Sequence, residues 1–225
     1  MTDKHITIAI DGPGGAGKST VADEVAKKLG ILHLDTGAMY RAFAFQALSE
    51  GIDPSDEAAL TELVGRTQID VELLENGVQR TLVNGVDVTD KIRTPEISFA
   101  ASTSSKCGAV RRFMVQKQQA LAKTRSMILD GRDIGTKVLT DATLKVFLTA
   151  TPQERAKRRY EQMLAAGQPA DYQQVLSDVI ARDHQDSTRK IDPLRPAEDA
   201  VIVDNTDFVQ AQTVAAILKL LEDRL

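Results

Sequence analysis

Gly12-Pro13-Gly14-Gly15-Ala16-Gly17-Lys18-Ser19 is the most informative stretch of this sequence, because it fits the phosphate-binding pattern G-x-x-x-x-G-K-[ST]. An apolar, β-branched run at residues 6–10 precedes it, and residues 19–29 follow with apolar side chains at helical spacing. A strand, a glycine-rich loop and a helix in this order bring backbone N–H groups and a helix N-terminus to one anion. We therefore predict that nucleotide phosphates bind at Gly12, Pro13, Gly14, Gly15, Ala16, Gly17, Lys18, Ser19 and Thr20.

Two side chains of this loop carry the expected chemistry. Lys18 should reach the β- and γ-phosphates, and the Ser19 hydroxyl should bind Mg²⁺. Asp130 follows the apolar run at 127–129, where a carboxylate can orient Mg²⁺ or its waters. A GTPase would need a guanine-reading Asn-Lys-x-Asp segment, which the sequence lacks, and a motor ATPase would normally need a longer chain. A second substrate must therefore be sought.

Short apolar runs recur along the chain at residues 31–34, 127–129, 144–148 and 201–203, each separated from the next by helical stretches. Strands that alternate with helices form a parallel sheet covered on both faces. Residues 67–92 break this rhythm, because alternating runs are separated there by Asn76-Gly77 and Asn84-Gly85, the strongest short-range hairpin signal. We therefore predict an α/β fold that carries an antiparallel β insert.

A second departure from the rhythm spans residues 151–190. Thr151-Pro152-Gln153-Glu154 is a capping box with proline at the first helical position, and Gly167 is expected to stop this helix. Another helix should run from Asp171 to about residue 187. Because both helices are polar and rich in arginine, we interpret them as a helical lid. The segments 1–66, 93–150 and 191–225 then form the predicted core.

Polar side chains follow two predicted strands at the carboxyl edge of the sheet, where ligands of open α/β folds bind. Thr36 and Arg41 follow the strand at 31–34, and Arg132 and Asp133 follow Asp130. An arginine can hold a phosphate through two parallel hydrogen bonds. A helix N-cap and a salt bridge are the plainer explanations of the same residues.

The two lid helices add basic residues at helical spacing. Residues 154–159 hold four basic residues out of six, and positions i and i+4 share a helix face. P-loop enzymes need arginines to neutralise charge on a transferring phosphoryl group, although a solvated basic face is the usual explanation of such a run. The candidates are Arg155 and Arg159 on the first helix, and Arg182, Asp186 and Arg189 on the second.

Composition restricts the class of protein. The 225 residues carry 28 Lys+Arg and 32 Asp+Glu, so the net charge of −4 argues against a general nucleic-acid binder. The 42% hydrophobic content is enough for a core and excludes a disordered chain. The single cysteine, Cys107, cannot form an internal disulfide. No run approaches about 18 apolar residues, so we expect no membrane span and a cytoplasmic protein.

Six segments together resemble the bacterial cytidylate kinases, a group of nucleoside monophosphate kinases. They are residues 10–20, 34–41, 92–94, 130–136, 154–159 and 182–189, of which D-[ST]-G-A-x-Y-R and D-G-R-D-x-G-T are the most particular. The resemblance implies a P-loop NTPase-type five-stranded parallel sheet with helices on both faces, a CMP-binding insert at 67–92 and a lid at 151–190. It implies that CMP and dCMP become CDP and dCDP, with ATP and Mg²⁺ as cofactors.

The resemblance also implies roles for single residues. Lys18, Arg155 and Arg159 would be catalytic, Arg158 would join the phosphate loop in binding ATP, and Ser19 and Asp130 would bind Mg²⁺. On the substrate side, Thr36, Arg111, Asp133 and Arg189 would contact cytosine or its surroundings, Arg182 and Asp186 the ribose, and Tyr40, Arg41 and Arg132 the rest of the nucleotide. Ser102 is assigned to the same substrate site.

The implied acceptor is a phosphate oxygen, which is already anionic near neutral pH because the second phosphate pKa is about 6. No general base is then needed, and alignment, charge neutralisation and exclusion of water remain. Two alternatives stay open: a small-acceptor kinase of the shikimate or dephospho-coenzyme A type, and a non-catalytic nucleotide sensor or regulatory ATPase. We interpret His5, His33 and His184 as surface or core residues, and we expect a monomer without nucleic-acid or membrane partners.

Overall fold

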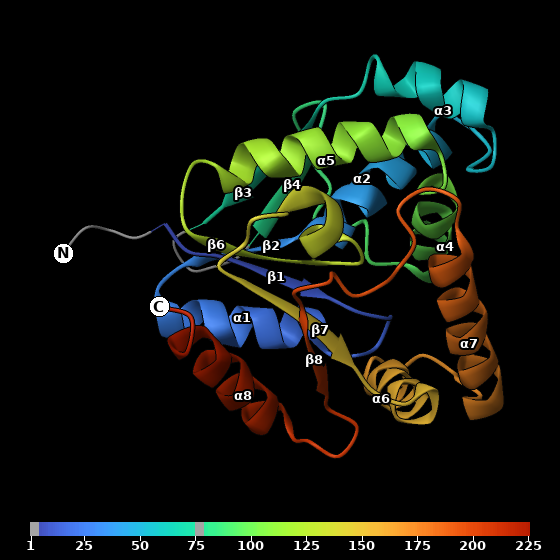
Figure 1. Cartoon of the computed structure of the whole chain (residues 1–225). Helices are drawn as coiled ribbons and strands as arrows, with labels where there is room; N and C mark the ends of the chain where they lie inside the picture. Colours follow the sequence, from blue (N-terminus) through green and yellow to red (C-terminus); the bar gives the residue numbers. More distant parts are fainter. Residues whose placement is uncertain (1–4, 75–78) are drawn as a thin grey trace.

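A computed structural model describes residues 5–74 and 79–225 of the chain. A parallel sheet of five strands crosses its centre in the order β2-β6-β1-β7-β8 (Figure 1). These strands are β1 (Thr7–Asp11), β2 (Leu32–Asp35), β6 (Met127–Gly131), β7 (Leu144–Thr149) and β8 (Val201–Asp204). Each of the five predicted apolar runs forms one of them, so the α/β fold with a parallel sheet is confirmed.

Helices cover both faces of this sheet (Figure 1). On one face, Ile8 and Ile10 of β1 pack with α1 (Lys18–Leu29) and α8 (Gln210–Glu222). On the other face, Ala9 packs with α2 (Thr36–Ser49) and α5 (Gly108–Ala122). Successive residues of one buried strand therefore enter two separate hydrophobic cores, as expected for a strand buried on both sides.

The predicted β insert is a separate antiparallel sheet in the order β3-β4-β5, formed by β3 (Ile69–Leu73), β4 (Gln79–Val83) and β5 (Val86–Asp87). Asn84 and Gly85 join β4 to β5 with φ values of 49° and 79°, as a type I′ hairpin turn requires. The other predicted turn, Asn76-Gly77, lies outside the described residues. Val83 and Ile92 pack with α2 and with α4 (Pro95–Ser104), while α3 (Glu57–Val64) lies just before the insert.

The predicted lid consists of α6 (Pro152–Ala165) and α7 (Tyr172–Thr188), which lie at the carboxyl end of the sheet (Figure 1). Thr151 caps α6 as expected, because its hydroxyl accepts a hydrogen bond from Glu154 N. The rings of Tyr160 and Tyr172 meet edge to face with centroids 6.0 Å apart and join the two helices. In the part of the chain that the structure describes, no helix is long and apolar enough to span a membrane.

A π-helix, η1 (Ile134–Val138), follows β6 and was not predicted. Its start is held by Asp11 at the end of β1, whose carboxylate accepts hydrogen bonds from Ile134 N and Gly135 N, both at 2.7 Å. Burial raises the pKa of Asp11 to about 6, although these two hydrogen bonds oppose the change. The carboxylate thus fixes the backbone directly after the Asp130–Asp133 segment at a cost in ionisation energy.

This raised pKa predicts how stability depends on pH. A carboxyl group whose pKa is higher in the folded state stabilises the fold below its unfolded value of 3.8, and that contribution is lost as the pH rises through about 6. Relative to Asp11→Asn, the wild type should lose about 2 kcal/mol of unfolding free energy between pH 4 and pH 7, at about 1.4 kcal/mol per pKa unit. Urea unfolding of both proteins across this range measures the difference; parallel curves would contradict the assignment.

Candidate functional site

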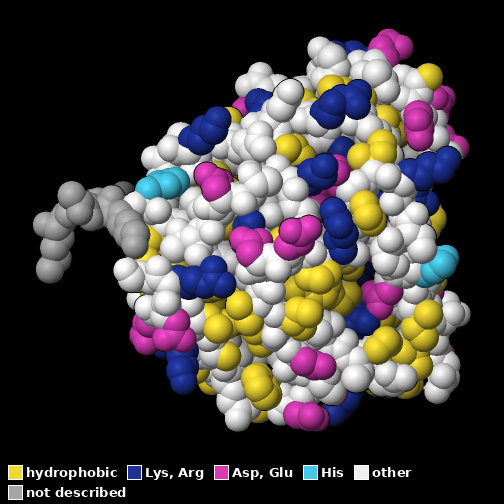
Figure 2. Space-filling view, viewed as in Figure 1, with side chains coloured by type: hydrophobic (Ala, Val, Ile, Leu, Met, Phe, Trp, Pro, Cys, Tyr) yellow, Lys and Arg dark blue, Asp and Glu magenta, His cyan; other side chains and the backbone are white. Residues whose placement is uncertain are grey.

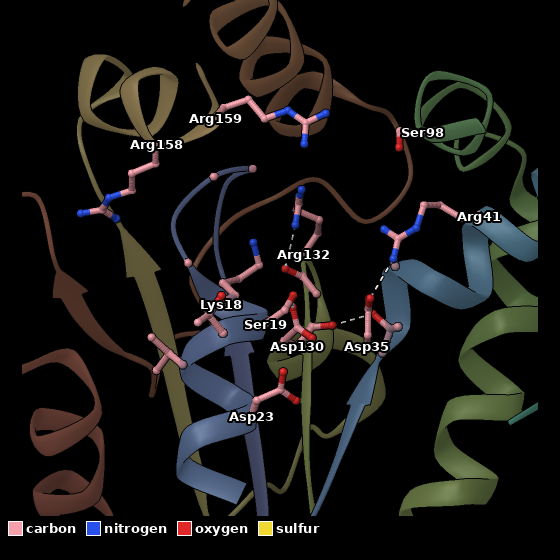
Figure 3. A pocket seen from close by; sticks show the side chains of 18 of the residues that line it. Lys18, Ser19, Asp23, Asp35, Arg41, Ser98, Asp130, Arg132, Arg158 and Arg159 are labelled. Atoms are coloured by element: carbon pink, nitrogen blue, oxygen red, sulfur yellow. Dashed lines mark hydrogen bonds and ion pairs between the residues drawn. The ribbon is translucent and has the colours of Figure 1, made fainter. Parts of the chain in front are cut away.

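A crevice of about 1380 Å³ opens at the carboxyl edge of the parallel sheet. The phosphate loop, the ends of β2 and β6, the β insert, α4, and both lid helices line it. This volume exceeds the roughly 300–1,000 Å³ of a site for one small molecule, so it has room for two. Figure 3 shows Lys18 and Ser19 at its floor, Arg132 in the middle, Arg159 above and Arg41 on the right.

The glycines of the phosphate loop have the conformations that their motif requires. Gly15 and Gly17 have φ values of 79° and 86°, which side chains of L-residues rarely adopt. A Cβ atom at Gly12 would lie 1.9 Å from the carbonyl oxygen of Leu148 on β7. The loop therefore packs directly on the sheet edge and exposes Gly14, Gly15 and Gly17 to the crevice.

Lys18 begins α1 at the bottom of this loop. Its ammonium group donates a hydrogen bond to the carbonyl oxygen of Pro13 at 2.8 Å. Burial, together with the positive charge of Arg132, lowers the pKa of Lys18 to about 7. An anion bound in the loop would compensate both effects, because a phosphate restores the charge balance around the ammonium group.

Ser19 and Asp130, the two residues expected to bind Mg²⁺, contact each other. The Ser19 hydroxyl donates to Asp130 Oδ2 at 2.9 Å. The other carboxylate oxygen, Oδ1, lies 2.7 Å from His33 Nε2, and His33 Nδ1 lies 2.6 Å from Asp23 Oδ1. Burial opposes protonation of His33, but its contacts with Asp130 and Asp23 raise its pKa to about 10. The sequence predicts no functional role for His33, but the structure places it between two carboxylates, those of Asp130 and Asp23.

An ion-pair network built on Arg111 occupies the substrate side of the crevice. The buried guanidinium of Arg111 donates to Asp133 Oδ2 and, at 2.9 Å, to Asp192 Oδ2. Arg189 Nη2 lies 3.5 Å from Asp133 Oδ1, and its Nε donates to the carbonyl oxygen of Asp192 at 2.6 Å. The Tyr40 ring lies 5.9 Å from the Arg111 guanidinium. The structure therefore brings together four residues that the sequence assigned to the substrate.

A second pair on this side joins the core to the lid. Arg132 Nε donates to Asp186 Oδ2 at 2.9 Å. Burial disfavours the charged form of Asp186, but the charges of Arg132 and Arg182 hold its pKa below the usual range. Thr36 lies close by and donates its hydroxyl to the carbonyl oxygen of Asp130 at 2.7 Å. All these predicted residues line the crevice.

Two further contacts hold α2 and α4 at the crevice. Arg41 Nη2 donates to Asp35 Oδ2 at 2.7 Å, while Arg41 Nε is buried without a hydrogen-bond partner among the described residues. An unused donor of this kind suits an anionic ligand. Across the crevice, the Ser102 hydroxyl accepts a hydrogen bond from Gln185 Nε2 of α7 at 2.5 Å.

The lid arginines fall into two groups: those that are bound to other protein groups, and those that have no ion-pair partner among the described residues. Arg155 is buried and donates to the carbonyl oxygens of Ala150 and Gly14 and to both carboxylate oxygens of Asp183. Among the described residues, it is one of four predicted site residues that do not line the crevice, with Gly12, Pro13 and Ala16. Arg158 faces the crevice but is bound to Asn205 and Glu154.

Arg159 and Arg182 form the second group. Both are exposed in the crevice, and neither has an ion-pair partner within the described ranges. The side chain of Arg182 passes within 4 Å of the position that a Cβ atom would take at Gly14, and so does that of Arg132. Partial removal from water, with the charge of Arg132, lowers the pKa of Arg182 to about 10. These two guanidinium groups therefore remain available to an anion.

Several residues that line the crevice have no role predicted from the sequence. They include His33, Asp23, Gln79, Arg93, Ser98 and Asn205. One signal was present for His33: in β2 it shares a strand face with Asp35, whereas Leu32 and Leu34 face the core. For Asn205, whose side-chain amide donates to the carbonyl oxygen of Ala16, no local pattern reveals the contact.

Two sequence comparisons with known proteins agree on one family. The sequence profile of the family described as "Cytidylate kinase" matches residues 8–223. The chain is 48% identical over 217 residues to "Cytidylate kinase" of Caldicellulosiruptor bescii, which covers 96% of each chain. It is 46% identical over 222 residues to "Cytidylate kinase" of Bacillus subtilis, with 99% of each covered.

Solved structures support the fold independently. Shikimate kinase from Bacteroides thetaiotaomicron matches with a TM-score of 0.52 at 14% identity, covering 96% of this chain and 98% of that one. At such low identity the match concerns the fold alone, and it places the chain among structures with this P-loop kinase architecture.

Proposed function

The chain belongs to the cytidylate kinase family, and from this we propose that it catalyses ATP-dependent phosphorylation of CMP, and of dCMP, by in-line transfer to the acceptor phosphate. Phosphoryl transfer needs two nucleotides held end to end and charge neutralisation between them. One crevice, with the phosphate loop at one end and the polar residues around Arg111 and Asp133 at the other, can hold two nucleotides in this way.

The observation that carries the proposal is the distribution of unpaired cations. Arg111, Arg132 and Arg189, on the acceptor side, each contact a carboxylate. Lys18 and Arg182, around the phosphate loop, have no carboxylate contact among the described residues, and Arg159 has none either. Unpaired cations stabilise the phosphates that they surround, whereas the paired arginines hold a fixed shape for the base and the sugar.

The acceptor side is polar, and three of its described carboxylates, those of Asp35, Asp133 and Asp186, contact arginines. Asp133 contacts Arg111, and Asp186 contacts Arg132. A carboxylate accepts hydrogen bonds only, so Asp133 suits the amino group of cytosine and Asp186 suits sugar hydroxyls. The acceptor phosphate needs no deprotonation, and Arg41, with its unused Nε donor, is our candidate to bind it.

The residues present fit Mg²⁺. Asp130 Oδ2 and Ser19 Oγ are hard oxygen ligands 2.9 Å apart, and Mg²⁺ in nucleotide sites uses one or two such groups together with phosphate oxygens. When bound, the ion would neutralise charge on the phosphates of ATP. Ser19 and Asp130 are therefore our candidates to hold it.

Arg155 receives a different role from the one expected from sequence. Arg155 lies in α6 and joins this helix to the phosphate loop through Gly14, to the segment between β7 and α6 through Ala150, and to α7 through Asp183. We propose that it positions the lid while Arg159 contacts the phosphates. Lid closure would exclude water, which otherwise competes with CMP for the phosphoryl group. The segment boundaries, the monomeric state, the cytoplasmic location and the absence of nucleic-acid or membrane partners remain predictions.

A coupled ADP-release assay with a panel of acceptors tests the function. We expect rapid ADP release with CMP and dCMP, and much slower release with UMP, AMP or shikimate. Discrimination of cytosine from uracil is expected to reach about 10²-fold or more in kcat/KM, because uracil would place a carbonyl oxygen, instead of an amino donor, against the Asp133 carboxylate that Arg111 and Arg189 hold in place. Equal ADP release without any acceptor would instead favour the ATPase alternative, and a maximum with shikimate would favour the small-acceptor kinase.

A further inference from the structure

His33 connects the phosphate-loop helix to the carboxylate expected at Mg²⁺. It lies on β2, and its side chain is only 7% exposed, between Asp23 of α1 and Asp130 of β6. Its ring nitrogens lie 2.6 Å from Asp23 Oδ1 and 2.7 Å from Asp130 Oδ1. Asp130 Oδ2 accepts a hydrogen bond from Ser19 at 2.9 Å. These four side chains form one continuous chain of hydrogen bonds that ends at the phosphate loop.

The two oxygens of Asp130 therefore have different partners. Oδ1 is bound by the imidazole on the side of α1 and β2, whereas Oδ2 faces Ser19 and the crevice. Without the imidazole, rotation about the terminal torsion of Asp130 would be broad, because this torsion has no sharp minima. The His33 contact removes that freedom at a side chain only 5% exposed.

We propose that His33 is a positioning residue for the reaction: it fixes the Asp130 carboxylate so that Oδ2 faces Ser19 and the divalent cation. This inference rests on the proposed function, since it concerns the same site. A hydrogen-bonded partner behind a ligating carboxylate typically changes metal affinity by about 10- to 100-fold when it is removed. Asp23 in turn fixes the imidazole, and its side chain is 49% exposed, so its own effect should be smaller.

The test measures cation binding directly. Mn²⁺ serves as the probe, and its free concentration is followed by electron paramagnetic resonance in the presence of enzyme and ADP. His33→Phe keeps a planar ring but donates no hydrogen bond, and should weaken Mn²⁺ binding by about tenfold or more. His33→Gln retains an N–H donor and should recover most of this loss. Asp23→Asn should weaken Mn²⁺ binding by only a fewfold.

Two measurements separate positioning from a general structural effect. The affinity for ADP without metal should stay within about twofold in His33→Phe, and the half-saturating Mg²⁺ concentration in the transfer assay should rise with the Mn²⁺ dissociation constant. His5→Phe, at an exposed site before β1, is the matched control and should change neither. If His33→Phe does not fold, His33→Val, which suits a strand, answers the same question.

Unchanged Mn²⁺ affinity in a folded His33→Phe or His33→Val variant would overturn the inference, and so would an equal loss of metal-free ADP affinity. These outcomes differ from a failure of the proposed function. In that case the wild-type protein would fail to transfer a phosphoryl group to CMP, whatever its affinity for Mn²⁺ in the presence of ADP.

Discussion

Lys18→Ala should lower kcat for CMP phosphorylation by at least about 10³-fold, which is about 4 kcal/mol of transition-state stabilisation. The Lys18 ammonium group lies at the floor of the phosphate loop, and the carbonyl of Pro13 is its one hydrogen-bond partner in the described part of the chain. Its charge is thus not used to stabilise another side chain. With ATP bound it is the cation best placed to follow charge that develops on the β- and γ-phosphates.

The same substitution should leave the fold intact. A buried ammonium group with a pKa lowered to about 7 does not stabilise the empty protein, so the melting temperature should not fall by more than a few degrees. Lys28→Ala is the matched control, because Lys28 is an exposed lysine of the same helix outside the crevice. It should retain wild-type kcat. If the kcat of Lys18→Ala lies within tenfold of the wild-type value, the proposed role of the phosphate loop is contradicted.

Periodicity and turn chemistry were sufficient to predict the sheet, the insert and the paired lid helices. The strand expected at residues 144–148 is β7 (Leu144–Thr149), and the helix expected to start at the Thr151 cap is α6 (Pro152–Ala165). The π-helix η1 could not be predicted from the sequence. Its first two N–H groups are bound by Asp11, more than 120 residues earlier, and no local pattern contains that contact.

Site residues could be predicted from the sequence where a polar or charged residue follows directly after a strand. They could not be predicted where a distant residue determines the direction of the side chain. Arg155 and Arg159 share a helix face in sequence, but Asp183 and the backbone of Gly14 bury the first and leave the second exposed. Helical spacing gives the face of a helix and not the depth at which each residue lies. For the same reason, the sequence did not reveal the contacts of His33, because its two carboxylate partners come from α1 and β6.

The net charge of −4 gives no indication of the field inside the crevice. On the face shown in Figure 2, Lys and Arg side chains lie among Asp and Glu side chains, as an acidic total would suggest. In the crevice, Asp35, Asp133 and Asp186 each face an arginine. Among the described crevice cations, Lys18, Arg159 and Arg182 have no carboxylate contact, and these groups are where the largest catalytic effects are expected.

Arg182→Met should lower kcat by about 10³-fold, within the range seen when an arginine that contacts a transferring phosphoryl group is removed. Methionine keeps the length and the apolar stem, so the change removes mainly charge and hydrogen-bond donors. Arg182 passes beside Gly14 next to Arg132 and has no carboxylate partner in the ranges that the structure describes. Steady-state kinetics with ATP and CMP varied independently measure the effect.

The division of this loss between kcat and KM distinguishes two roles for Arg182. If it stabilises the transferring group, kcat falls and the KM for CMP changes little; if it binds only the ribose, the KM for CMP rises and kcat is retained. Arg125→Met, at an exposed position outside the crevice, is the matched control and should change neither constant. We expect the first pattern, because Arg182 lies beside the phosphate loop while Asp186, one turn further along α7, is already bound to Arg132.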